Sequence, residues 1–447
     1  MSLFDACGVP LSSGTRASVD RYETAIGMLL GRPGDPQAEV AAALAEDPHF
    51  VMGYCLRAAL LILSADEAVE PALRECLAAA DGLAHRANDR ERRHIAAARA
   101  WLARDLARAI RTYGELLIDY PRDRVALRVG HFGDYFLGQH AMLRDRVAQV
   151  LPCWDESLPG YGHVLGMYAF GLEETAHYAQ AEDTARRALE LDRPNPGAVH
   201  AIAHVMEMQG RQREGITWLA ETRPQWDRGD GTATHLAWHL ALFHLDLNET
   251  ATALDIYDTR IAAHAGMRLS SLADASALLW RLHLRGLSLG GRWRELAGRW
   301  AGKALSGCFP FNDLHALVAF IGAGDSRRVE HTLQTLRNRA AAGDPGAQRI
   351  RDISLPIAEA FAAFGREDYG AAIEGFSRIR VMGQLGGSHA QQDALHLTLI
   401  EAALRHRHFR LARALAAERT ALKPGSAFNR ALSLRAVSSE AGLGIAA

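Results

Sequence analysis

The feature that most constrains this sequence is a histidine pattern that recurs at a fixed distance. His-x-x-x-His occurs at His200 and His204, and again at His235 and His239, 35 positions later. Residues four apart share one face of a helix, so each pair would present two imidazoles side by side. A period near 35 residues is typical of helix–turn–helix units that stack on one another. The pattern therefore predicts stacked helix pairs whose equivalent histidines lie close together.

The remainder of the chain has the composition of helices. Ala, Leu, Arg and Glu dominate, and alternating β-branched runs are missing. Clusters of Asp, Pro and Gly recur roughly every 30 to 40 residues, as at 33–36, 120–123 and 192–196. We predict an all-α fold, an α-solenoid of about 11 to 12 tetratricopeptide-like helix pairs. The sequence leaves open whether the solenoid curls into a closed superhelix.

Small residues mark the places where the helices of a pair are expected to meet. In the segment from Tyr178 to Asn195, Tyr178, Ala181 and Ala188 match the aromatic and small positions of a tetratricopeptide repeat. A solenoid has no size limit on its core, because each repeat packs only on its neighbours. We therefore expect one solenoid over residues 1–447, with N-terminal repeats at 19–305, C-terminal repeats at 326–435 and a seam near 306–325.

Composition excludes several classes of function. The formal net charge is −2, which predicts no nucleic-acid partner and no anionic membrane surface. The five cysteines are scattered without C-x-x-C spacing, which argues against a disulfide framework or a cysteine zinc site. We find no signal peptide and no apolar run long enough to cross a bilayer, so we expect a cytoplasmic protein. A homo-oligomer is left open.

Histidines also recur at the start of the first helix in successive repeats. His131, His163, His200 and His235 are each the second residue of such a segment. In a solenoid the first helices line the concave surface, so these side chains would form a row along it. We assign ligand-binding roles to a set that includes three of these and three further residues: His131, His163, His235, Trp238, His389 and Asp393.

The catalytic candidates are His200, His204, Glu207 and His239. Neutral imidazoles with one carboxylate suit a divalent metal such as Zn, Fe or Ni, and His200, His204 and His239 are the expected ligands. The spacing is not that of H-E-x-x-H, because Ala-Ile-Ala separates the first pair. Without a metal, the same histidines could act as general acid and base. A P-loop and a G-x-S-x-G nucleophile motif are absent from the sequence.

Several long blocks resemble a known family. HAIAHVMEMQGR, HLAWHLALFHLDL and GGSHAQQD are similar to signature blocks of the tetratricopeptide repeat protein 38 family. They follow the family's order within a stretch from about position 47 to about position 422. The resemblance implies an α-solenoid of atypical repeats in a cytoplasmic protein and implies no particular reaction. It places His200, His204, Glu207, His235, His239 and His389 inside signature text.

Two functions are consistent with these patterns. In the first, a His-rich concave pocket binds a small molecule, acidic or amide-bearing, and transforms it by hydrolysis or lyase chemistry. In the second, the solenoid is a non-enzymatic scaffold that captures a peptide in its groove, which is the usual function of this fold.

Overall fold

The computed structural model describes residues 3–228, 231–263, 268–303, 305, 307, 309–378 and 385–440. In these residues the chain is almost entirely helical, apart from one short antiparallel pair of strands, β1 (Leu3–Phe4) and β2 (Pro10–Leu11). The prediction of an all-α helical-repeat fold is confirmed. Ser306 and Cys308 of the expected seam lie outside the described residues.

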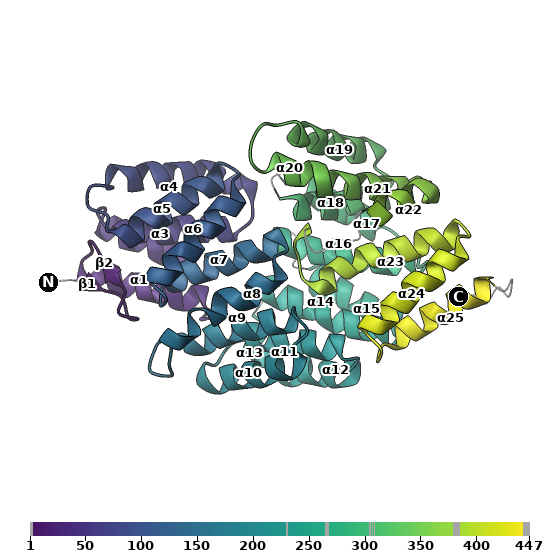
Figure 1. The fold of residues 1–447 in the computed structure, drawn as a ribbon, viewed down its shortest axis with the longest axis horizontal. Helices are drawn as coiled ribbons and strands as arrows, with labels where there is room; N and C mark the ends of the chain where they lie inside the picture. The colour runs from purple at the N-terminus through teal and green to yellow at the C-terminus, as the bar shows by residue number, and fades with distance from the viewer. Residues whose placement is uncertain are drawn as a thin grey trace. The chain divides into compact units, whose positions relative to one another are not determined.

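The chain divides into two compact units within helix α11 (Pro196–Met208). The first unit contains residues 1–201 together with 344–346, and the second contains residues 202–343 and 347–447. The expected seam near 306–325 falls inside the second unit. Figure 1 labels the helices of both units.

The first unit holds the strand pair and a series of helix hairpins. Its helices before α11 are α1 (Arg16–Leu29), α2 (Pro36–Glu46), α3 (Val51–Leu63), η1 (Glu67–Val69), α4 (Glu70–Gly82), α5 (Asp89–Leu102), α6 (Leu106–Asp119), α7 (Arg124–Leu137), α8 (His140–Ala148), η2 (Leu151–Cys153), α9 (Tyr161–Glu173) and α10 (Tyr178–Leu191). Side-chain caps define where several of them begin. Thr15 and Asn88 form capping boxes at α1 and α5, which satisfy backbone N–H groups that the first turn leaves unpaired.

The hairpin of α9 and α10 shows how small residues set the packing. Ala181 and Ala188 are fully buried, which confirms their predicted role as contact positions. Gly162 on α9 lies so close to α10 that a Cβ atom there would come within 2.8 Å of the Ala188 carbonyl oxygen. Only a residue without a side chain allows that approach, and the two helices therefore pack almost backbone to backbone.

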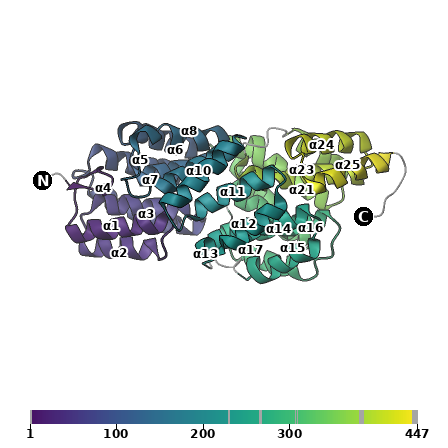
Figure 2. The same ribbon diagram turned by 90° about the horizontal axis from the view of Figure 1, so that it is seen from below.

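The second unit continues the helix hairpins from α11. Its further helices are α12 (Gln212–Glu221), α13 (Arg223–Trp226), α14 (Gly231–Asp246), α15 (Thr250–Ile256), η3 (Tyr257–Ile261), α16 (Leu269–Leu284), α17 (Arg292–Ala301), α18 (Pro310–Gly322), α19 (Ser326–Ala340), α20 (Ala347–Arg349), η4 (Ile350–Ser354), α21 (Leu355–Gly365), α22 (Tyr369–Arg378), α23 (His389–Arg405), α24 (Phe409–Leu422) and α25 (Ala427–Glu440). Figure 2 shows α14 beside α16.

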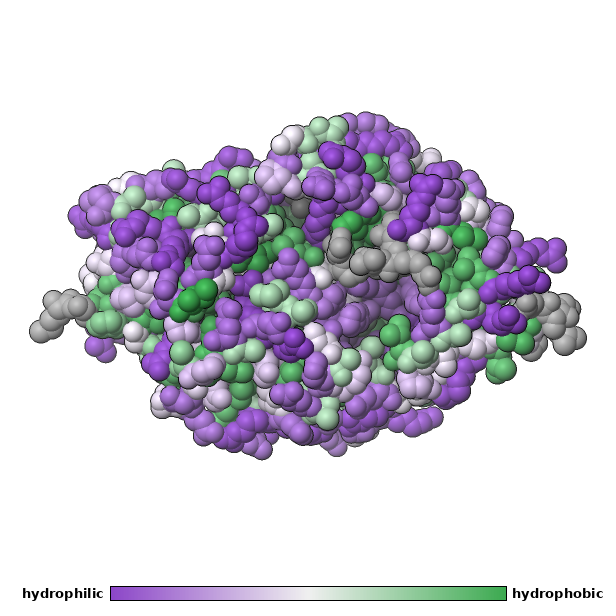
Figure 3. Space-filling view, in the orientation of Figure 1, coloured by the Kyte–Doolittle hydropathy of each residue, from purple (hydrophilic) through white to green (hydrophobic). Residues whose placement is uncertain are grey.

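Helices far apart in sequence meet in this unit. Helix α16 packs against α23 and α14 contacts α25, so the C-terminal hairpins return to the helices that carry the histidine pattern. A core of buried apolar residues runs continuously from α14 to α25. None of the helices in the described ranges is long and apolar enough to cross a membrane. The face drawn in Figure 3 is mostly hydrophilic, with smaller hydrophobic patches.

Candidate functional site

Three imidazoles meet in the interior of the second unit. His204 comes from α11, and His235 and His239 come from α14. One ring nitrogen from each of the three lies within 4.8 Å of the others. The ring centroids of His204 and His239 are 4.4 Å apart, and those of His235 and His239 are 4.9 Å apart. The 35-residue register therefore brings histidines of successive repeats into one cluster, which we call the imidazole cluster.

Two carboxylates pair with histidines of this cluster. The Nδ1 atom of His235 lies 3.0 Å from an Asp274 carboxylate oxygen, and Nδ1 of His239 lies 3.3 Å from Glu207 Oε2. A carboxylate accepts, so each imidazole donates through Nδ1. In the neutral ring the lone pair is then on Nε2. A carboxylate that accepts from one imidazole nitrogen and leaves the other nitrogen as a possible ligand is the combination seen around protein-bound metal ions.

A lysine from the C-terminal part of the unit completes the surroundings of Glu207. Lys423 Nζ donates to Glu207 Oε1 over 2.6 Å. Gly210, which has φ +74°, ends the turn after α11, and a Cβ atom there would lie 2.6 Å from Cα of Gly425. The absence of a side chain at Gly210 therefore lets the turn that carries Lys423 dock beside the end of α11.

Burial and charge together set the protonation of the cluster. Burial lowers the pKa of His204 to about 3 and that of His239 to about 3, although Glu207 works in the opposite direction. Burial also opposes charge on His235, but Asp274 beside it prevails and raises its pKa. Burial disfavours the Glu207 carboxylate, yet Lys423 and the histidines hold its pKa well below the ordinary value. His204 and His239 are thus neutral near pH 7.

Helix α16 connects this cluster to its surroundings through two charged residues. Arg281, seven residues after Asp274, donates to the carbonyl oxygens of Ala277 at 3.0 Å and Ala390 at 2.5 Å. Its guanidinium carbon lies 5.3 Å from the Trp238 ring centroid, and Trp238 in turn stacks on His235. Sequence reasoning missed Asp274, Arg281 and Lys423. The available signal for the first two was their position as charged residues within a helix that is otherwise rich in Ala and Leu.

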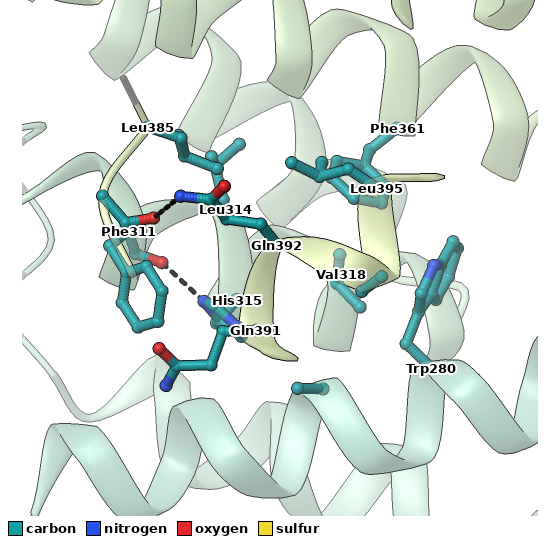
Figure 4. A pocket seen from close by; sticks show the side chains of 13 residues that line it. Trp280, Phe311, Leu314, His315, Val318, Phe361, Leu385, Gln391, Gln392 and Leu395 are labelled. Carbon is teal, nitrogen blue, oxygen red and sulfur yellow. Dashed lines mark hydrogen bonds between the residues drawn. The ribbon is translucent and has the colours of Figure 1, made fainter. Parts of the chain in front are cut away.

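A cavity lies beside α16, lined in part by Ala277 and Trp280 of that helix. Its empty space, counted together with the open solvent at its mouth, is about 430 Å³. Figure 4 shows apolar side chains at one end and polar ones at the other. The lining residues are Ala277, Trp280, Phe311, Leu314, His315, Val318, Phe361, Leu385, Gly386, Gln391, Gln392, Ala394 and Leu395. His315 donates from Nδ1 to the Phe311 carbonyl oxygen at 2.7 Å, and burial lowers its pKa to about 4.

Three of the predicted histidines belong to the first unit. The rings of His131 on α7 and His200 on α11 both lie near the ring of Phe170, at centroid distances of 6.2 and 5.4 Å. Burial lowers the pKa of His131 to about 3. His163 on α9 is also mostly buried, and burial lowers its pKa although Asp192 raises it. Two members of the expected row therefore share Phe170 as an aromatic neighbour.

The remaining predicted residues lie at the start of α23 and near α7. Ser388 accepts from the backbone N–H of Gln391 and caps α23. His389 is the first residue of that helix, and Asp393 pairs with the Arg419 guanidinium at 2.9 Å. Asp134 is three residues after His131 on α7. It forms a two-point ion pair with Arg146, at 2.5 and 2.9 Å, because the buried guanidinium offers two donors.

Comparison with known proteins found no protein-family model that matches the chain. A solved structure of human IFIT1 dimer with m7Gppp-AAAA is similar over 95% of both chains, with 13% identity and a TM-score of 0.42. Human IFIT1 dimer with PPP-AAAA matches 77% of this chain and 89% of its own, with 14% identity and a TM-score of 0.24. The P58(IPK) TPR domain matches 88% of this chain and 98% of its own, with 13% identity and a TM-score of 0.22. These are distant similarities, and no property of those proteins is transferred to this chain.

Proposed function

We propose that the second unit binds a divalent transition-metal ion through His204, His235 and His239, and that the site hydrolyses a small molecule. The observation that carries this proposal is the convergence of three imidazoles, two of which donate through Nδ1 to buried carboxylates. A neutral histidine oriented in this way presents its other nitrogen as a ligand. His235 thus joins His204 and His239 in the proposed ligand set.

The donor geometry fits such an ion. Bonds of about 2.0 to 2.1 Å to a tetrahedral ion place the nitrogens about 3.3 Å apart. The nitrogens in this structure lie within 4.8 Å of one another, so small side-chain rotations would gather them. Imidazole ligands favour Zn, Fe or Ni over Mg or Ca. An ion held by three histidines keeps an open position, from which it polarises a carbonyl group and activates water.

The other residues of the site would act through the histidines. Glu207 bonds to His239 on one oxygen and to Lys423 on the other, so we assign it an orienting role. Asp274 performs the same function for His235. The ion pair with Lys423 offsets the negative charge of Glu207, which limits the charge that must be buried beside the metal.

The two helices that hold these ligands also hold the blocks that resemble the tetratricopeptide repeat protein 38 family. HAIAHVMEMQGR includes the C-terminal part of α11, and HLAWHLALFHLDL covers most of α14. We therefore propose that the chain is a member of that family and acts in the cytoplasm.

The test is elemental analysis of the full-length protein, purified without chelator or histidine tag. We expect about one zinc, iron or nickel ion per chain, lost in His239→Ala. The matched control is His244→Ala on the same helix, where Nδ1 of the histidine pairs with Glu249 at 2.6 Å outside the cluster. Equal loss in both variants, or no uptake by wild-type protein after incubation with zinc, cobalt or nickel, would contradict the proposal.

A further inference from the structure

We propose that the cavity beside α16 receives an uncharged small molecule with an apolar body and an amide group, and that it rejects the matching carboxylate. His315 would accept a hydrogen bond from the amide N–H. The inference rests on the proposed function for the role of this molecule as substrate. The selectivity itself is a binding property of the cavity and does not need the metal.

The cavity and the imidazole cluster share one helix. Asp274 and Ala277 are three residues apart on α16, so they lie on the same face. Asp274 pairs with His235, and Ala277 lines the cavity. The electrostatic influence of Asp274 and Arg281 also reaches His315. A molecule seated in the cavity would therefore lie next to the residues that orient the proposed metal ligands.

The lining selects against charge. None of the described side chains that line the cavity is ionised at neutral pH, and most are aromatic or aliphatic. Arg281 already donates to two backbone carbonyl oxygens and faces Trp238, and Arg349 donates to the carbonyl oxygen of the lining residue Leu385 at 2.9 Å. A carboxylate buried here would lose its hydration without gaining an ionic partner, which is strongly unfavourable. Acidic substrates, which the sequence left open, are therefore disfavoured.

The two ends of the cavity have different chemistry. Figure 4 shows Trp280, Val318 and Phe361 near one end and Phe311 with His315 near the other. The indole N–H of Trp280 donates to Thr398 Oγ1 at 2.9 Å, which fixes the ring as a wall. Such a wall suits a flat apolar group. The body of the ligand would lie against it, with the polar group directed toward His315.

His315 can serve only as an acceptor in this position. Its Nδ1–H is committed to the Phe311 carbonyl oxygen, so the neutral ring carries its lone pair on Nε2. The ligand must therefore offer a donor. A primary amine would be charged and an ester has no N–H. An amide is neutral, offers a donor and can be hydrolysed.

Hydrolysis of this ligand would also explain how the product leaves. Water oxygen bonds to the carbonyl carbon, the carbon–nitrogen bond breaks, and a proton from water passes to the departing amine. The acid formed is ionised at neutral pH. Because the cavity offers no ionic partner among its described lining residues, the carboxylate product would bind less tightly than the amide substrate.

The test compares 2-naphthylacetamide with 2-naphthylacetate by isothermal titration calorimetry on the full-length protein at pH 7.5. The two probes share one body and differ in charge and donor. We expect the amide to bind at least about tenfold more tightly, which corresponds to about 1.4 kcal/mol. His315→Leu should reduce this ratio to about threefold or less, whereas His331→Leu, an exposed histidine on α19, should leave it unchanged. Val318→Phe, which narrows the cavity, should weaken both probes.

Equal or tighter binding of the acid, no binding of either probe by wild-type protein, or an unchanged ratio in His315→Leu would overturn the inference. The ratio of amide affinity to acid affinity in wild-type protein tests the selection against charge, even if a variant does not fold. His239→Ala separates this inference from the proposed function. Retained amide binding in that variant, with a wild-type protein that takes up no metal, would refute the metal site and leave the cavity assignment standing.

Discussion

Each of the two units buries a group of histidine and carboxylate side chains. The two groups differ in the side chains that pair with the carboxylates. In the first unit one oxygen of the Asp123 carboxylate accepts from the Arg90 guanidinium at 2.6 Å and lies 2.8 Å from His94 Nε2. The side chains of Arg90 and Asp123 are both 0% exposed. The other Asp123 oxygen accepts from the backbone of Ala126 and caps α7. We call this group the arginine clasp.

The comparison shows that the chemistry of the side chain paired with a buried carboxylate decides whether the group can offer metal ligands. A guanidinium is always charged and has only donors, so Arg90 joins α5 to α7 without offering a ligand, and the arginine clasp contains a single imidazole, that of His94. In the imidazole cluster the carboxylates are met mainly by neutral rings, each of which has a second nitrogen. The first arrangement stabilises a fold, whereas the second can bind a metal. The predictions below test that distinction.

The largest effect is expected in the arginine clasp. Asp123→Asn keeps an acceptor for the helix cap but removes the nearer of the two carboxylates that face the buried Arg90, and leaves only Asp5 at 3.5 Å. Breaking a buried pair in this way destabilises a protein by about 3 to 5 kcal/mol. Urea denaturation should show this loss, while the metal content of the folded protein stays unchanged. If the variant lost metal and kept its stability, the proposed difference between a structural group and a metal-binding group would be wrong.

A smaller effect is expected from the carboxylate behind His235. Asp274→Asn should weaken metal affinity by about 10- to 100-fold, because the carboxylate orients the ligand and raises its basicity. Competition with a chromophoric chelator measures this change. The matched control is Asp258→Asn, which breaks only a partly exposed ion pair with Arg292. If the two variants hold metal equally well, Asp274 does not support the site.

The pH dependence of stability should reveal a buried neutral histidine in the first unit. Burial lowers the pKa of His131 to about 3, so near neutral pH the unfolded chain binds this proton more readily than the folded protein. The stabilisation is present above the unfolded pKa, near 6.5, and is lost as pH falls toward 3. Between pH 7 and pH 5 this group should remove about 2 kcal/mol.

Urea midpoints for wild type and His131→Leu, measured with chelator at both pH values, test this expectation. The variant should lose less stability than wild type over that interval, because it lacks the titrating group. Parallel losses in the two proteins would mean that His131 is not held neutral by its surroundings.

The smallest effect is expected from a surface pair. Arg16 and Asp20 lie four residues apart on α1, with side chains 91% and 63% exposed. Pairs of this kind contribute about 0.5 kcal/mol or less, because water and salt screen them. Asp20→Asn should therefore shift the urea midpoint little. A loss comparable to that of Asp123→Asn would show that burial does not explain the contrast.

The sequence by itself determined the helical-repeat architecture and part of the site. Several features of the fold depend on local sequence alone. They are the periodic apolar residues, small residues such as Ala181 and Ala188, and the Ser388 cap. The 35-residue spacing brought His204 and His239 together because equivalent positions of successive repeats are neighbours.

Only the tertiary structure decided which residues surround those histidines. Asp274 is 39 positions from His235, and Lys423 is 216 positions from Glu207. Local pattern shows which face of a helix is apolar, but it does not show which distant helix will cover that face. That choice depends on how the whole core packs, including the close approach of Gly210 and Gly425. The carboxylates, the lysine and the cavity behind α16 are products of that packing.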